Sequence, residues 1–185
     1  MPQVKRIPEP WHSFLKELDE KVTAETRLDC MGGFVVTMQH GLSRETADLD
    51  VLVIAPREQR DVLLEFGGQG GLLHKKYRVY LDYVGVAKLP EDYEERVVEM
   101  FPGVYKHLRL CALDPYDLAL SKLERNIQRD RDDVKHLARA ASFDLGVLKE
   151  RYEKELRWQL GNPEREDLTL RLWVEMIEED RGKGG

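Results

Sequence analysis

The sequence predicts a protein of the α+β (α/β) class, with a small mixed β-sheet flanked by helices and a helical C-terminal part. The apolar run at 51–54 ends close to a proline, as expected of a buried strand. Residues 78–86 alternate apolar and polar side chains, which is typical of a half-buried strand. Beyond this core, the apolar residues recur at helical spacing. We therefore expect an α/β core at 1–113 and a helical part at 114–185 that packs on it.

The elements of the core are predicted from residue spacing and glycine breaks. Apolar residues recur at helical spacing from 11 to 26, so a first helix is expected there. A short apolar segment at 28–31 precedes Gly32-Gly33, and the residues after this pair favour a short helix that ends near Gly41. Three further elements complete the core: a helix at 57–66, a helix at about 91–100 and a strand at 104–113.

The helical part is predicted to begin at Asp114-Pro115. An acidic residue is a favoured N-cap, and proline is favoured at the first helical position. Breaks at Asn126, near Ser142 and at Gly161 divide the rest of the chain. The predicted helices are 115–126, 129–141, 144–159 and 164–180.

Composition restricts the class of protein. No apolar run approaches the ~18 residues of a membrane span, so we expect no membrane association. Two isolated cysteines, outside any metal-binding spacing and without a secretion signal, favour a cytoplasmic location. The net charge of −6 argues weakly against a general nucleic-acid coat protein. A local basic patch, or a nucleotide held through a metal ion, remains compatible with it.

Asp48 and Asp50 are candidate metal ligands. They stand two residues apart on a predicted strand, so their carboxylates share one face with Cα atoms roughly 6.5–7 Å apart. Two like charges at the start of a buried strand cost free energy, which a divalent cation would offset. Taken alone, this pattern favours a metal site and a merely solvated strand end equally.

Gly32-Gly33 adds a candidate phosphate site. The pair follows a short apolar strand and opens the next element. Free backbone N–H groups at a helix start can bind a phosphate, and glycine permits its close approach. A glycine pair alone is more often only a turn. Together with the aspartate pair it indicates a phosphate site beside metal ligands.

These residues resemble a known family. Residues 31–33 (Met-Gly-Gly) and 44–51 (Arg-Glu-Thr-Ala-Asp-Leu-Asp-Val) are similar to the signature of the DNA polymerase β-like nucleotidyltransferase superfamily. The resemblance implies a nucleotidyltransferase fold and Mg²⁺ or Mn²⁺ bound by Asp48 and Asp50. It also implies that Gly32 and Gly33 contact the triphosphate of a nucleoside triphosphate. Asp82 is the candidate for the superfamily's third catalytic, metal-binding carboxylate.

A second segment resembles one branch of that superfamily. Residues 122–134 look like the Lys…Arg-Asp-x-x-Asp segment of the AbiEii-like and MenT-like bacterial nucleotidyltransferases, which include toxins of toxin–antitoxin systems. The resemblance implies that Lys122 contacts nucleotide phosphates. It places Arg129, Asp130 and Asp133 at the nucleotide site as well. The alternative is an ordinary ion-pair ladder on an exposed helix.

The leading hypothesis is a metal-dependent nucleotidyltransferase. It would move a nucleoside monophosphate from a nucleoside triphosphate to an acceptor. The acceptor would be an RNA or tRNA end, a protein or a small molecule. An antitoxin protein would be a further partner. Arg44 is assigned to nucleotide binding, although neutralising Asp48 is an equal alternative. A basic cluster at 75–78 is either a solvated strand edge or a place for an acceptor nucleic acid. The alternative function is a catalytically silent module that binds a nucleotide or a partner.

Overall fold

The computed structural model describes residues 6–184 and divides the chain into two compact units. The N-terminal segment, in which the sequence predicts no secretion signal, lies partly outside these residues. The first unit comprises Met1–Gln39, Ser43–Val86 and Val97–Leu113; the second comprises His40–Leu42, Ala87–Arg96 and Asp114–Gly185.

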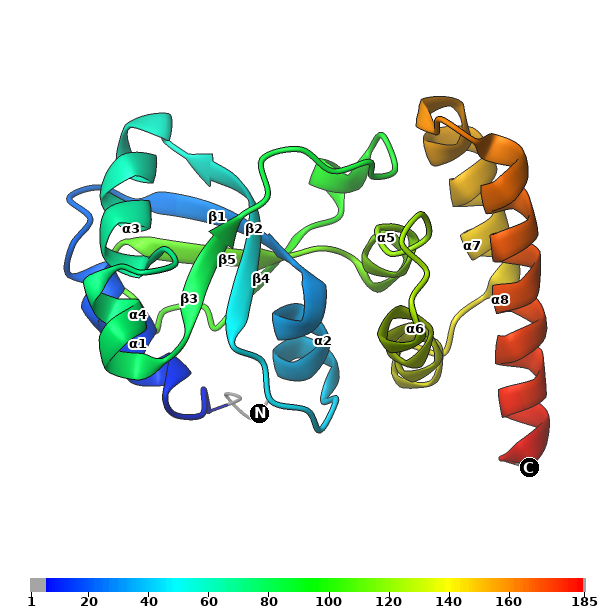
Figure 1. The fold of residues 1–185 in the computed structure, drawn as a ribbon, viewed down its shortest axis with the longest axis horizontal. Coiled ribbons are helices and arrows are strands. Elements are labelled where there is room, and N and C mark those ends of the chain that lie inside the picture. The colour runs from blue at the N-terminus through cyan, green and yellow to red at the C-terminus, as the bar shows by residue number, and fades with distance from the viewer. Residues whose placement is uncertain (1–5, 185) are drawn as a thin grey trace. The chain divides into compact units, whose positions relative to one another are not determined.

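The first unit contains a five-stranded mixed sheet (Figure 1). Its strand order is β3-β2-β1-β5-β4, and β1–β2 and β4–β5 pair antiparallel while β1–β5 and β2–β3 pair parallel. The predicted class, a small mixed sheet flanked by helices, is confirmed. The strands are β1 (Thr26–Met31), β2 (Asp48–Ala55), β3 (Tyr80–Tyr83), β4 (Val98–Met100) and β5 (Leu108–Ala112).

Helices α1 (Trp11–Asp19), α3 (Arg60–Gly67) and α4 (Leu72–Tyr77) lie together beside the sheet, on the left of Figure 1. The Leu18 and Leu81 side chains both lie within 3.4 Å of where a Cβ on Gly67 would stand, so helix and strand are in close contact. Leu81 is buried under these helices. Because strand side chains alternate, residues next to Leu81 on β3 point to the other face of the sheet.

Helix α2 (Gly32–His40) begins at the glycine pair, as predicted. The first helix ends earlier than the predicted residue 26. Asp19, its last residue, accepts hydrogen bonds from the backbone N–H groups of Lys106, His107 and Leu108. These bonds fix the end of α1 to the segment that enters β5, and the chain then turns into β1.

The predicted helix at 91–100 is wrong. Residues Tyr93–Glu95 form one 3₁₀ turn, and Val98–Met100 form the edge strand β4, which pairs antiparallel with β5. A second difference is α4, which lies where the sequence indicated only a glycine-rich loop before a strand. The strand expected at 78–86 is shorter, Tyr80–Tyr83, and it is flanked by left-handed backbone at Arg78 (φ +63°) and Gly85 (φ +69°).

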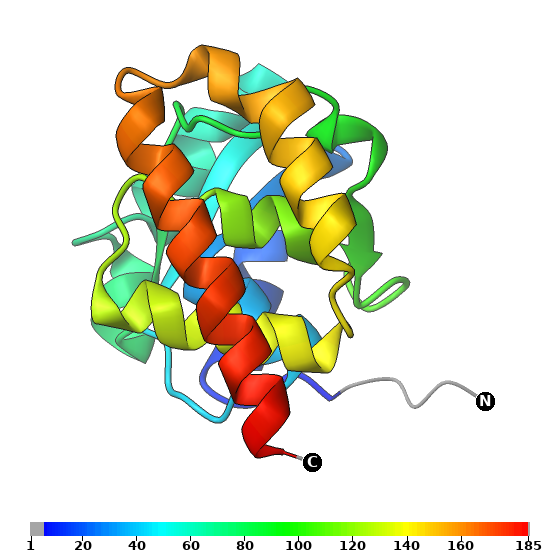
Figure 2. The same ribbon diagram turned by 90° about the vertical axis from the view of Figure 1, so that its right-hand side faces the viewer.

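The second unit is helical after Asp114. The Asp114 carboxylate accepts hydrogen bonds from the N–H groups of Tyr116 and Asp117, so the predicted N-cap is confirmed. In Figure 2 the long last helix, which begins at Pro163, crosses the helix that begins at Gln128. Trp173 of the last helix donates a 2.9 Å hydrogen bond to the Asn126 side chain. The helices are α5 (Pro115–Leu120), α6 (Gln128–Ala140), α7 (Leu145–Arg151, continued by a π turn at Tyr152–Leu156) and α8 (Pro163–Lys183).

Among the described residues, no helix combines the length and the apolar character that crossing a membrane requires.

Candidate metal and nucleotide site

Three aspartates meet on neighbouring strands of the first unit. Asp48 and Asp50 lie on β2, and Asp82 lies on β3 directly opposite Asp50 in the parallel register. One carboxylate oxygen of each residue lies within 4.8 Å of the others. Asp48 and Asp50 are half-buried and Asp82 is exposed, so the group opens to solvent.

The donor set fits a hard divalent cation. Mg²⁺ and Ca²⁺ take oxygen ligands, and carboxylates are their usual protein donors. Oxygens bound to one Mg²⁺ at about 2.1 Å lie at most about 4.2 Å apart, so only small side-chain movements would bring this group to bonding distance. The three like charges also repel one another, and a cation would remove that repulsion.

Gly32 packs directly against this group. Met31 is paired with Asp50 across the sheet, which brings the start of α2 to the aspartates. A Cβ atom at Gly32 would stand 2.1 Å from the Asp50 Oδ2 atom. The backbone φ of Gly32 is +75°, a conformation that other residues rarely adopt. Both the space and the backbone therefore require glycine at this position.

Gly33 follows Gly32 in the first turn of α2. The first N–H groups of a helix have no partner within the helix and carry a partial positive charge. An anionic group held near the aspartates by a cation would meet these N–H groups. The geometry thus places carboxylates suited to a cation next to a helix start suited to an anion.

Tyr80 is a neighbour of the aspartates that the sequence interpretation did not select. It pairs with Asp48 in the β2–β3 register and shares its strand face with Asp82. Burial, followed by the charges of Asp48, Asp82 and Asp50, raises the pKa of the Tyr80 phenol. The sequence could have indicated Tyr80, because it stands two residues before Asp82 on the predicted strand. Side chains two residues apart on a strand point in the same direction.

Arg44 lies between α2 and β2 and is half-buried. Its backbone carbonyl accepts a 3.2 Å hydrogen bond from the Thr37 hydroxyl. Because β2 begins only at Asp48, Arg44 precedes the strand, and strand alternation does not determine the direction of its side chain. Its assignment to nucleotide binding stays a prediction.

The second unit holds a buried ion cluster. Lys122 is only 6% exposed, and its Nζ lies 3.0 Å from an Asp133 oxygen and 3.8 Å from an Asp130 oxygen. Arg125 donates two hydrogen bonds to Asp130, at 2.8 and 2.6 Å. Three of the residues predicted at 122–133 are therefore brought together, inside the helical unit.

The charges around Asp130 favour its ionised form. Burial by itself would raise the pKa of Asp130, but the Arg125 hydrogen bonds, the Ile127 N–H and the Lys122 charge together lower it below its ordinary value. Arg129, the fourth residue of the predicted group, is exposed on α6. The role of the four residues in nucleotide binding stays a prediction.

The mixed sheet, with a glycine-opened helix beside an acidic group on two neighbouring strands, is the arrangement of a nucleotidyltransferase fold. The sequence profile of a family described as "Nucleotidyltransferase of unknown function (DUF6036)" matches residues 13–181. The chain belongs to this family, and a nucleoside triphosphate is the substrate that the family name implies. Comparisons with curated proteins and with solved structures found no match.

Proposed function

We propose that the protein is a metal-dependent nucleotidyltransferase that moves a nucleoside monophosphate from a nucleoside triphosphate to an acceptor hydroxyl. The observation that carries the proposal is the contact between Gly32 and Asp50 within the group of three carboxylates. It places a helix start suited to phosphate directly beside residues suited to a cation. A solvated strand end would have no need of this arrangement.

Asp48, Asp50 and Asp82 would hold Mg²⁺ or Mn²⁺. When bound, the cation neutralises phosphate charge and supports displacement at phosphorus. Gly32 and Gly33 would bind the triphosphate through the N–H groups of the first turn of α2.

In the proposed reaction, the acceptor oxygen forms a bond to the α-phosphorus. The bond from that phosphorus to the oxygen bridging the α- and β-phosphates breaks, and pyrophosphate leaves. The hydroxyl proton passes to the carboxylate of Asp82, the most exposed of the three, or to solvent. The protein contributes mainly position and charge, because this transfer needs no covalent enzyme intermediate.

The similarity of residues 122–134 to the toxin-like branch extends the proposal. Lys122, Arg129, Asp130 and Asp133 would support nucleotide binding, and so would Arg44. The cellular role that this resemblance favours is that of a toxin whose activity an antitoxin protein restrains. Growth arrest on expression of the wild-type chain, but not of an Asp50→Ala chain, is the expected sign of that role.

The test uses purified protein with each nucleoside triphosphate labelled at the α-phosphate, Mg²⁺ or Mn²⁺, and either total RNA or cell extract. A doubly substituted protein, Asp48→Ala with Asp50→Ala, is the control. Label in RNA, protein or a small molecule identifies the acceptor. If no combination gives transfer, or if the control transfers equally, the enzymatic proposal fails. Nucleotide binding without turnover would then favour a silent binding module.

A further inference from the structure

Tyr80 and His74 form an aromatic pair at the edge of the proposed site. Their ring centroids are 4.8 Å apart with the planes tilted by 51°. Tyr80 is half-buried and stands opposite Asp48, two residues before Asp82. A flat, partly exposed ring therefore lies within the same group of side chains that is suited to metal and phosphate.

His74 is held in position from the outer edge of β3. Gly68 bridges Leu81 at that edge, and the Gly70 N–H donates a 2.8 Å hydrogen bond to the His74 Nδ1 atom. The accepting Nδ1 atom carries no proton, so in the neutral ring the proton lies on Nε2. The contact with this fixed imidazole restrains the Tyr80 ring before any ligand arrives.

The strand order separates this aromatic pair from the phosphate site. Tyr80 and Asp82 are on the edge strand β3, the aspartate pair is on β2, and Gly32 follows β1 on the far side of β2. A triphosphate bound at the start of α2 would thus occupy one side of the aspartates. Tyr80 lies on the other side, which leaves that side of the aspartates to the attacking group.

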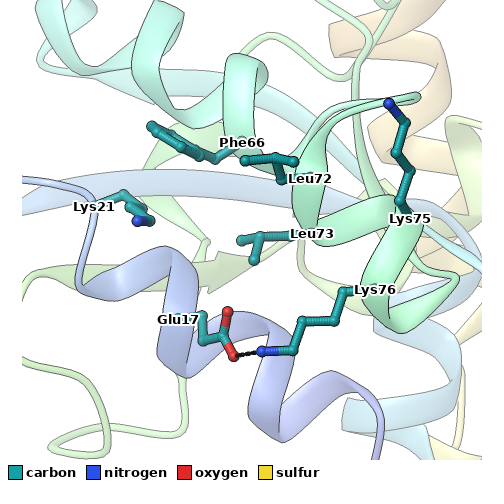
Figure 3. Close-up of a pocket in the computed structure, with 7 residues that line it drawn as sticks. All are labelled: Glu17, Lys21, Phe66, Leu72, Leu73, Lys75 and Lys76. Atoms are coloured by element: carbon teal, nitrogen blue, oxygen red, sulfur yellow. Dashed lines mark hydrogen bonds and ion pairs between the residues drawn. The ribbon is translucent and has the colours of Figure 1, made fainter.

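Basic side chains continue from His74 along α4. Lys75 and Arg78 are exposed, and Arg78 ends the helix with φ +63° immediately before β3. Lys76 is engaged by a 2.5 Å hydrogen bond to Glu17, whereas Lys75 points away from that pair (Figure 3). The neighbouring surface is a pocket of about 460 Å³ with an apolar wall and a lysine rim, lined by Glu17, Lys21, Phe66, Leu72, Leu73, Lys75 and Lys76.

An aromatic ring followed by exposed cations is the chemistry that binds single-stranded nucleic acid, because bases stack on rings and phosphates meet cations. We propose that Tyr80, positioned by His74, stacks on the terminal base of the acceptor, so that the acceptor is the end of a single-stranded nucleic acid. Lys75 and Arg78 contact its phosphates. This inference rests on the proposed nucleotidyl transfer and adds the class of acceptor to it.

The test compares two short single-stranded RNAs that differ only at the last nucleotide. One RNA carries an intact terminal nucleotide. The other carries an abasic terminal nucleotide with the same hydroxyl groups. The protein variants are Tyr80→Leu, Tyr80→Phe and, as matched control, Tyr83→Leu on the same strand with the opposite side-chain direction. The readout is the ratio of kcat/KM for the intact RNA to kcat/KM for the abasic RNA.

We expect the wild-type protein to prefer the intact RNA by roughly 5- to 150-fold, which corresponds to ~1–3 kcal/mol of stacking per base. Tyr80→Leu lowers this ratio toward one, and Tyr80→Phe and Tyr83→Leu preserve it. A wild-type ratio near one overturns the inference without requiring any variant to fold. Label found only in protein also overturns it but leaves nucleotidyl transfer intact. No transfer to any acceptor, with no metal-dependent binding of nucleoside triphosphate, instead overturns the proposed function.

Discussion

The Asp50 carboxylate occupies the space that a side chain at Gly32 would need. Its Oδ2 atom lies 2.1 Å from the position of a Cβ on Gly32. In the proposed site, this glycine would serve two purposes: it would open α2 toward a phosphate and leave room for the Asp50 carboxylate beside a metal ion.

Gly32→Ala is expected to weaken divalent metal binding by about 10–100-fold, because the new methyl group displaces Asp50 from its position. Gly103→Ala is the matched control. Gly103 has a similar φ of +77°, but a Cβ there would meet nothing within 4 Å. Both substitutions cost about 1–2 kcal/mol of backbone strain. Titration with Mn²⁺ followed by electron paramagnetic resonance measures the difference. Equal affinity in the two variants would contradict the assigned role of Gly32.

Asp82→Asn should lower the rate of nucleotidyl transfer by on the order of 100-fold or more, because a preorganised charge at the reacting group is lost. Asp61→Asn is the control, since the Asp61 side chain is 94% exposed on α3. Single-turnover kinetics at saturating nucleotide separates this effect from weaker binding. If Asp82→Asn retains the wild-type rate, Asp82 has no part in the reaction.

Lys122→Met should lower the free energy of unfolding by about 3–5 kcal/mol, because two buried carboxylates lose their shared cation. Lys135→Met removes a more exposed ion pair, in which the Lys135 Nζ atom lies 3.8 Å from the Asp132 Oδ1 atom. This change should alter the free energy of unfolding by less than about 1 kcal/mol. Urea denaturation at neutral pH measures both. Similar losses in the two variants would argue against a buried ion cluster at Lys122.

The pKa of Asp130 gives a pH dependence with a defined sign. Its folded-state pKa lies below the ordinary value of about 3.9, so ionised Asp130 stabilises the fold above that pH. This contribution is lost as the pH falls through the lowered pKa. The stability difference between wild type and Asp130→Asn should therefore be constant near neutral pH and shrink below about pH 4. Asp132→Asn, at an exposed position, serves as control, and a difference that persists unchanged in acid would refute the assignment.

Local sequence patterns predicted the strands that carry the aspartates. Val51 and Leu49 are fully buried, and the alternation that buries them turns Asp48 and Asp50 to the other face. The parallel pairing that brings Asp82 to this face is a long-range contact, so the sequence supported it only through resemblance. Tyr80 was overlooked for the same reason, because its significance depends on which strand lies beside β2.

The incorrect helix at 91–100 shows how tertiary contacts override local preference. The segment is rich in glutamate, which favours a helix, yet Arg96 forms bidentate hydrogen bonds with buried Asp117 and also bonds to Glu155. Val98–Met100 instead complete the sheet by pairing with β5. The missed helix α4 is only six residues long between glycine and Arg78, so periodicity gave little indication of it.

The most direct test of the account follows the position of the label in the nucleoside triphosphate. Wild-type protein with Mg²⁺ or Mn²⁺ is given triphosphate labelled at the α-phosphate or at the γ-phosphate, and pyrophosphate is counted in the same samples. We predict that only the α-label reaches the acceptor, with one pyrophosphate released per transfer, and that Asp50→Asn abolishes both. Transfer of the γ-label, or equal α-label transfer by Asp50→Asn, would contradict nucleotidyl transfer at this site.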